Sequence, residues 1–254
     1  MLQLPLDQLI LFIAQAVLLV LLIARLWSAQ LQRIYPFFFG YLLAELLRTA
    51  ILAAVPYRGP AYPKVWVATE LFVDCFYPLI VVELYRVVLR DLPGIATAAR
   101  RFIAGTVVVA TFGSLLLLRL EETPKNYVSV TFVIDRAVIF SMVIFILLVS
   151  MFLLYYPVRL SRNAVFYSIG YAVYFLTKAA GLFVRTLGYY IAPLLGTAFF
   201  IVFDACLLFW ILTLNKQGEL STVVLGHKWK NEDEALLLSK LKDINAHLLA
   251  AGKK

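Results

Sequence analysis

The stretch from Pro63 to Val88 is apolar enough to cross a membrane, yet it contains acidic side chains. A carboxylate in the hydrocarbon region costs at least a few kcal/mol, so it must be neutralised, paired or turned toward an interior cavity. Glu70 and Asp74 are four residues apart and share one face of a helix. No basic residue of that helix lies between them. They are therefore predicted either to pair across a bundle with Arg136 or Lys178, or to hold a proton.

A third acid of this stretch, Glu83, lies closer to its end. Arg86 follows three residues later and Arg90 seven residues later. Residues at these spacings lie on the same side of a helix, which favours an ion pair near the membrane surface. This interpretation leaves Glu83 outside the candidate site.

Two further patterns place polar groups in apolar stretches. Glu45 and Arg48 are three residues apart, so they can pair on one helix face and neutralise each other. A second helix carries a stripe at positions i, i+4, i+7 and i+11 that ends on a cation. Such a stripe is typical of a packed core or of a site wall, and its tyrosine hydroxyls need partners. The stripe consists of Tyr167, Tyr171, Tyr174 and Lys178.

These residues together predict a ligand-binding site inside the membrane. Its basic members, Arg48, Arg136 and Lys178, are expected to counter negative groups of a ligand. Some of its acids are expected to serve a coupled proton or cation, namely Glu70, Asp74 and Asp204. The full predicted set is Glu45, Arg48, Glu70, Asp74, Asp135, Arg136, Tyr171, Tyr174, Lys178 and Asp204.

Several catalytic chemistries lack their residues in this sequence. Both histidines, His227 and His247, follow the last apolar stretch, so no membrane helix supplies an imidazole ligand or a histidine base. The sequence contains no HExxH, GxSxG, Walker A or Rossmann glycine motif. We therefore expect no enzyme activity, no cofactor and no metal site.

The elements that position the candidate residues are predicted to be membrane-spanning helices. Hydrophobic residues make up 63% of the 254 residues, against roughly 45–50% in soluble domains. A hydrocarbon core of about 30 Å requires about 20 helical residues, which seven stretches provide. The predicted fold is an all-α bundle of seven transmembrane helices. The stretches are about Leu9–Trp27, Pro36–Val55, Pro63–Val88, Arg101–Leu118, Tyr127–Tyr155, Ala164–Leu187 and Tyr190–Leu214.

Basic residues predict how this bundle is oriented. Lys and Arg are concentrated after the first, third, fifth and seventh stretches and are sparse in the other connections. The positive-inside rule then places the N-terminus outside and the C-terminus in the cytoplasm, as in a multi-pass protein of the bacterial inner membrane. The same distribution accounts for the net charge of +8, so the lipid bilayer rather than nucleic acid is the expected partner.

A shift of 130 residues aligns parts of the two halves of the sequence. Gly40-Tyr41 falls on Gly170-Tyr171 and Arg48 falls on Lys178. The same shift places Asp74 on Asp204. This alignment predicts a possible parallel repeat of three helices, one linking helix and three helices, although two similarly spaced helix triplets give some matches by chance.

The residues after Leu214 have a different character and are predicted to form a second region, 215–254. An acidic first turn after Asn231 and apolar residues at helical spacing predict a short amphipathic helix at about 231–250. This helix could lie on the inner membrane surface, pair with a partner protein or a second copy, or pack on the cytoplasmic face of the same chain.

Four features of the membrane part occur together. They are RIYPFFFGYLLAE at Arg33 to Glu45, the thirteen-residue spacing of Glu70 and Glu83, ELYRVVLRDLP from Glu83, and the pair Asp135-Arg136. As a set they resemble a family of uncharacterised seven-helix integral membrane proteins of soil bacteria. The resemblance covers most of the membrane part and not the tail after Leu214. It implies the seven-helix topology and no particular activity.

Three functions are compatible with these patterns. The first is an outward-facing intramembrane pocket that binds or transports a small polar or charged solute, coupled to protons or cations. The second is a membrane sensor that signals through its cytoplasmic tail. The third is a non-catalytic membrane subunit or scaffold, in which buried charges pair and fix the helix register.

Overall fold

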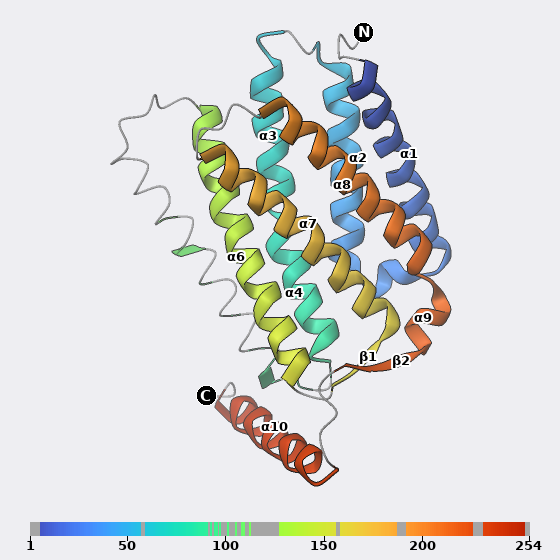
Figure 1. The fold of residues 1–254 in the computed structure, drawn as a ribbon, viewed down its shortest axis with the longest axis vertical. Coiled ribbons are helices and arrows are strands. Elements are labelled where there is room, and N and C mark those ends of the chain that lie inside the picture. The colour runs from blue at the N-terminus through green and yellow to red at the C-terminus, as the bar shows by residue number, and fades with distance from the viewer. Residues whose placement is uncertain are drawn as a thin grey trace.

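A computed structural model describes residues 6–56, 59–90, 127–155, 158–186, 192–225 and 231–251, with single residues between 92 and 112. The described chain is almost entirely helical and forms one bundle, below which α10 lies across its lower end (Figure 1). The larger helices are α1 (Leu6–Ser28), α2 (Pro36–Ala54), α3 (Tyr62–Asp74), α4 (Phe76–Val88), α6 (Tyr127–Tyr155), α7 (Arg162–Thr186), α8 (Ala192–Thr213) and α10 (Asn231–Ala251).

Within the described residues, four helical segments are long and apolar enough to cross a membrane. They are Leu9–Ser28, Pro36–Ala54, Tyr62–Val88 and Val130–Leu153. Many large apolar side chains on these segments are exposed, as expected for surfaces that face lipid. The chain is therefore a helical membrane protein.

The predicted helices correspond closely to observed ones where the structure describes them. The predicted stretch Tyr127–Tyr155 has the same bounds as α6, and the predicted tail helix at about 231–250 corresponds to α10. The predicted helix Arg101–Leu118 lies largely outside the described residues.

The predicted helix Pro63–Val88 differs, because the structure divides it at Cys75 into α3 and α4. Pro78 explains this division. Its ring has no N–H to donate to the carbonyl of Asp74, four residues earlier, and it crowds that carbonyl. Cys75 keeps helical torsion angles, so the two helices follow one another as a single apolar segment. Asp74 thus lies at the point where the helix is interrupted.

A small structure at the α10 end of the bundle was not predicted. The short strands β1 (Val158–Ser161) and β2 (Thr222–Leu225) pair antiparallel, and the short helix α9 (Lys216–Leu220) lies between α8 and β2. Asn163 is fully buried and donates to the carbonyl of Asn215 over 2.7 Å. Tyr35 donates to Glu219 over 3.0 Å. These bonds attach the residues that follow α8 to the start of α7 and to the residue that precedes α2.

Tyr35 keeps its proton in this environment. Burial, together with the nearby Glu219 carboxylate, raises the pKa of the Tyr35 phenol. The phenol is therefore a stable donor to Glu219.

The amide side chain of Asn245 attaches α10 to residues 94 and 95. The amide oxygen of Asn245 accepts hydrogen bonds from the backbone N–H of Gly94, at 2.7 Å, and of Ile95, at 3.3 Å. Leu241 is 4% exposed and belongs to the apolar core. In this structure α10 therefore packs against its own chain.

Candidate functional site

Six charged side chains from four helices form one group, which we call the charge cluster. It lies in the half of the bundle that contains the start of α3 and the end of α7, away from α10 (Figure 1), and we call this the charged half. All four of its acids are buried. The members are Glu45 and Arg48 from α2, Glu70 and Asp74 from α3, Asp135 from α6 and Lys178 from α7.

Lys178 lies at the centre of the charge cluster. Its Nζ is 2.9 Å from Asp135 Oδ1, 3.2 Å from Glu70 Oε1 and 3.7 Å from Asp74 Oδ1. One oxygen from each of these carboxylates lies within 4.8 Å of the others, a grouping that could hold a metal ion. In this structure the ammonium group of Lys178 is close to all three, so it supplies the positive charge there.

Arg48 holds the other side of the charge cluster. Its Nη1 is 3.4 Å from Glu45 Oε2, which confirms the pairing predicted from their spacing. Its Nη2 binds Glu70 Oε2. Glu70 is therefore held between Arg48 and Lys178, the two cations that the 130-residue shift aligns. Asp74 and Asp204, which the same shift aligns, share no partner among the described residues, and the repeat stays a prediction.

Three tyrosine hydroxyls extend the charge cluster. Lys178 donates to Tyr77 over 3.1 Å, and its Nζ lies 4.7 Å from the centre of the Tyr77 ring. The hydroxyls of Tyr77 and Tyr174 are 2.8 Å apart, and Tyr41 donates to Tyr174 over 3.4 Å. Tyr41 is also 3.4 Å from a carboxylate oxygen of Glu45. These contacts join α2, α4 and α7 through one hydrogen-bonded group.

The charge cluster contains more acids than bases. Four carboxylates face two cations, so its formal charge with every group ionised is −2. Neither oxygen of Asp74 receives a hydrogen bond from a described donor, whereas Asp135 Oδ1 lies 2.9 Å from Lys178 Nζ. Uncompensated charge is costly at this depth, so the excess has to be balanced by protons or by a bound cation.

A cavity of about 300 Å³ borders the charge cluster. Glu45, Arg48, Glu70, Asp135 and Lys178 form its polar wall. The remaining wall is mostly aromatic. This part is lined by Trp66, Tyr77, Phe132, Tyr174, Phe199, Phe200 and Phe203.

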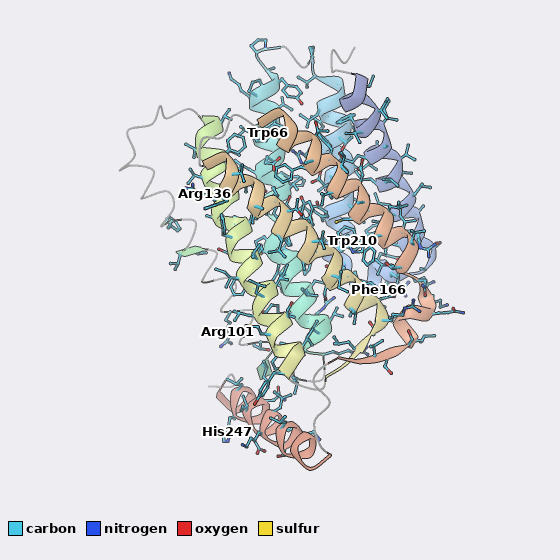
Figure 2. The ribbon with its side chains drawn as sticks, viewed as in Figure 1. Trp66, Arg101, Arg136, Phe166, Trp210 and His247 are labelled. Carbon is cyan, nitrogen blue, oxygen red and sulfur yellow. The ribbon has the colours of Figure 1, made fainter. Side chains whose placement is uncertain are left out.

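The other half of the bundle, nearer to α10, is closed by packed aromatic rings, and we call it the aromatic half. Phe38, Tyr171 and Trp210 are fully buried, with ring centroids 4.8–5.6 Å apart. Trp210 lies closer to α10 than Trp66 does (Figure 2). Gly170 allows this packing, because a Cβ atom there would lie 2.4 Å from Trp210 Nε1. A larger side chain at Gly170 would force the buried Trp210 ring to move.

Glu83 belongs to the aromatic half, and the predicted ion pair with Arg86 or Arg90 is wrong. Its carboxylate accepts hydrogen bonds from the backbone N–H of Phe37, at 2.7 Å, and of Phe38, at 3.1 Å. Tyr167 donates a third bond over 2.9 Å. The first N–H groups of a helix have no partner within it and attract an anion, so α4 caps α2 with this side chain.

Four predicted site residues do not line the cavity. Asp74 belongs to the charge cluster but not to the cavity wall. Arg136 follows Asp135 on α6 but does not line the cavity. Tyr171 is fully buried in the aromatic half, and its hydroxyl has no hydrogen-bond partner among the described residues. Asp204 forms no ion pair with a described residue and does not line the cavity. A step of one or two residues along a helix places a side chain on a different face, which the charge of the residue does not show.

The site also contains residues that were not predicted from the sequence. Gln15 is 6% exposed, lines the cavity, and has an amide oxygen without a described partner. A buried glutamine in an apolar stretch was the available signal. Tyr41 and Tyr77 join the charge cluster through their hydroxyls, and Trp66 and Phe132 pair as rings in the cavity wall. Nothing in their spacing separates these rings from ordinary core aromatics.

Comparison of the chain with protein-family models, with curated proteins and with solved structures found no match.

Proposed function

We propose that this chain binds a small polar or charged solute in the cavity beside the charge cluster. The observation that carries this proposal is the combination of a cavity of about 300 Å³ with five charged groups in its wall. Ligand pockets begin at about this size and combine an apolar lining with a few convergent polar groups. Ionisable groups at membrane depth that surround a cavity are typical of solute and ion pathways.

In this proposal the protein is a multi-pass protein of the bacterial inner membrane with seven transmembrane helices. The N-terminus lies outside, so the charged half opens toward the outer surface and α10 lies on the cytoplasmic side. The distribution of Lys and Arg supports this orientation. Transport would follow if the aromatic half opens in a second conformation, as in proteins that expose one site alternately to each side.

A screen of solutes in proteoliposomes tests the proposal. Binding and uptake are measured for the wild type, for Asp74→Asn and for the matched variant Asp204→Asn, which removes a membrane carboxylate outside the charge cluster. We expect at least one solute to bind to the wild type and to Asp204→Asn, with weaker binding to Asp74→Asn. Equal behaviour of all three proteins toward every solute would contradict a site at the charge cluster.

Two observations favour a sensor as the second candidate function. The aromatic half is closed, so the cavity resembles a cup rather than a channel. The amide of Asn245 attaches α10 to residues 94 and 95 and could transmit a change in the bundle. We expect Asn245→Leu to abolish a cellular response and to leave solute affinity intact. Loss of affinity in this variant would count against the sensor.

The scaffold is supported least. A scaffold needs its buried charges fully paired and no cavity, because its charges serve only to fix the helix register. Here a cavity borders the charged groups, and buried oxygens of Gln15, Asp74 and Asp204 lack hydrogen bonds from described donors.

A further inference from the structure

The wall of the cavity indicates which sign of charge a ligand carries. The sequence suggested that its cations would bind negative groups of a solute. In the structure Arg48 contacts Glu45 and Glu70, and Lys178 contacts Glu70, Asp74 and Asp135. Both cations are already engaged by acids, and an anion would have to displace these partners. The acids exceed the bases by two formal charges, so the excess charge favours a positive ligand.

One buried oxygen that borders the cavity is available to such a ligand. Gln15 lines the cavity and is 6% exposed, and its amide oxygen accepts no hydrogen bond from a described residue. An amide oxygen is an acceptor, so it suits a ligand that brings positive charge or N–H and O–H donors. Asp135 also lines the cavity, and its Oδ1 is held by Lys178 Nζ at 2.9 Å.

The rest of the wall favours an organic cation over a metal ion. Tryptophan, tyrosine and phenylalanine rings attract cations through their faces, and such sites commonly recognise alkylated ammonium groups. The protein itself provides an example here, because the ammonium group of Lys178 lies 4.7 Å from the centre of the Tyr77 ring. A metal ion would need several oxygens around one point. The three carboxylates that could provide them, Glu70, Asp74 and Asp135, already surround Nζ of Lys178. The ammonium group therefore takes the place of a metal ion there.

The size of the cavity limits the ligand further. A volume of about 300 Å³ is at the lower end of small-molecule pockets. It accommodates a small amine or quaternary ammonium compound and excludes larger lipophilic cations.

Charge balance connects the ligand to a proton. Carboxylate oxygens of Asp74 and Asp135 lie within 4.8 Å of one another, and Asp74 has no hydrogen-bond donor among the described residues. Two like charges at this distance in an apolar medium favour retention of a proton. When a monovalent cation enters, both carboxylates can ionise without a change in the charge of the site. The charged and titratable groups around this pair are Glu45, Arg48, Glu70, Tyr77, Tyr174 and Lys178, and Arg136 follows Asp135 in the sequence.

We propose that the cavity binds a small monovalent organic cation in exchange for one proton. The proton leaves the pair Asp74 and Asp135 as the cation enters, and it passes to bulk water. This inference rests on the proposed solute site and specifies its ligand.

Calorimetric titration of the full chain in lipid nanodiscs tests the exchange. The probes are choline, its neutral isostere 3,3-dimethylbutan-1-ol and the anion 3,3-dimethylbutanoate. Titration in two buffers with different ionisation enthalpies gives the number of protons released. We expect choline to bind at least about tenfold more tightly than either comparison compound, with release of about one proton.

Substitutions in the cavity wall and the charge cluster test which residues bind choline and which release the proton. Asp74→Asn combined with Asp135→Asn is expected to weaken choline binding at least about tenfold and to release no proton. The matched control Asp204→Asn is expected to bind choline as tightly as the wild type and to release about one proton. Trp66→Leu preserves the charges and is expected to weaken choline binding about three- to tenfold without changing the proton count. This variant keeps the proposal testable if the double variant fails to fold.

The outcomes separate this inference from the proposed function. Equal or tighter binding of the neutral or anionic isostere would overturn the cation but leave a solute site in place. Choline binding without proton release would overturn the exchange. Absence of choline binding would overturn the inference, and the solute screen on the same preparation would then decide the proposed function separately.

Discussion

The two halves of the bundle both bury carboxylates, but they satisfy them differently. In the aromatic half, Glu83 receives three hydrogen bonds from two backbone N–H groups and Tyr167. In the charged half, Asp74 receives none from a described donor and depends on Lys178 at 3.7 Å. The first acid completes a helix end, and the second belongs to the charge cluster that borders a cavity. A buried acid therefore indicates a binding site only where its partners leave it incompletely satisfied and space adjoins it.

The largest effect is expected when the central cation of the charge cluster is removed. Lys178→Met leaves Glu70, Asp74 and Asp135 without their shared ammonium group, and loss of one partner of a buried ion pair costs about 3–5 kcal/mol. We expect the free energy of unfolding in detergent to fall by this amount. Addition of Asp135→Asn to Lys178→Met should recover part of the loss. An additive, further loss in the double variant would contradict the ion-pair account.

A smaller loss of stability is expected in the aromatic half. Glu83→Ala removes the acceptor for two backbone N–H groups and one hydroxyl, and hydrogen bonds to a charged group are each worth about 1.5–3 kcal/mol. Because water can replace part of this capping, we expect a loss of about 2–3 kcal/mol in unfolding experiments. Solute affinity of the folded fraction should stay unchanged. A large drop in affinity would show that the two halves are not separate in function.

The smallest effects distinguish two neighbouring tyrosines of one helix. Tyr167→Phe removes the hydroxyl that donates to Glu83 and should cost about 1 kcal/mol. Tyr171→Phe removes a buried hydroxyl that has no partner among the described residues, so stability should stay within about 0.5 kcal/mol of the wild type or increase. Thermal unfolding of both variants in the same detergent measures the difference. Equal losses would imply that Tyr171 has an acceptor in solution.

The sequence predicted most of the observed helices, because apolar length and breaks at Pro and Gly are local properties. The interruption at Cys75 was missed even though Pro78, four residues after Asp74, is the local signal for it. The strands β1 and β2 were missed because they pair residues more than 60 positions apart.

The candidate site was predictable to the level of residue type and helix face. Charges at membrane depth identified Glu70, Asp74 and Lys178, which the structure brings together. Sequence could not show that Arg48 also binds Glu70, or that Glu83 caps α2, because both contacts join separate helices. Asp204 was included for its charge and its place in the proposed repeat. Neither property shows whether its side chain reaches the cavity.

The most direct test of the central claim is the accessibility of the cavity to charged reagents. Thr177 lines the cavity, so Thr177→Cys, with Cys75 and Cys206 replaced by alanine, places one thiol there. Intact cells are treated with a trimethylammonium methanethiosulfonate or its sulfonate counterpart, neither of which crosses the membrane. An outward-facing, acidic cavity predicts modification from outside, at least about tenfold faster by the cationic reagent. No modification from outside, or equal rates for the two reagents, would contradict the account.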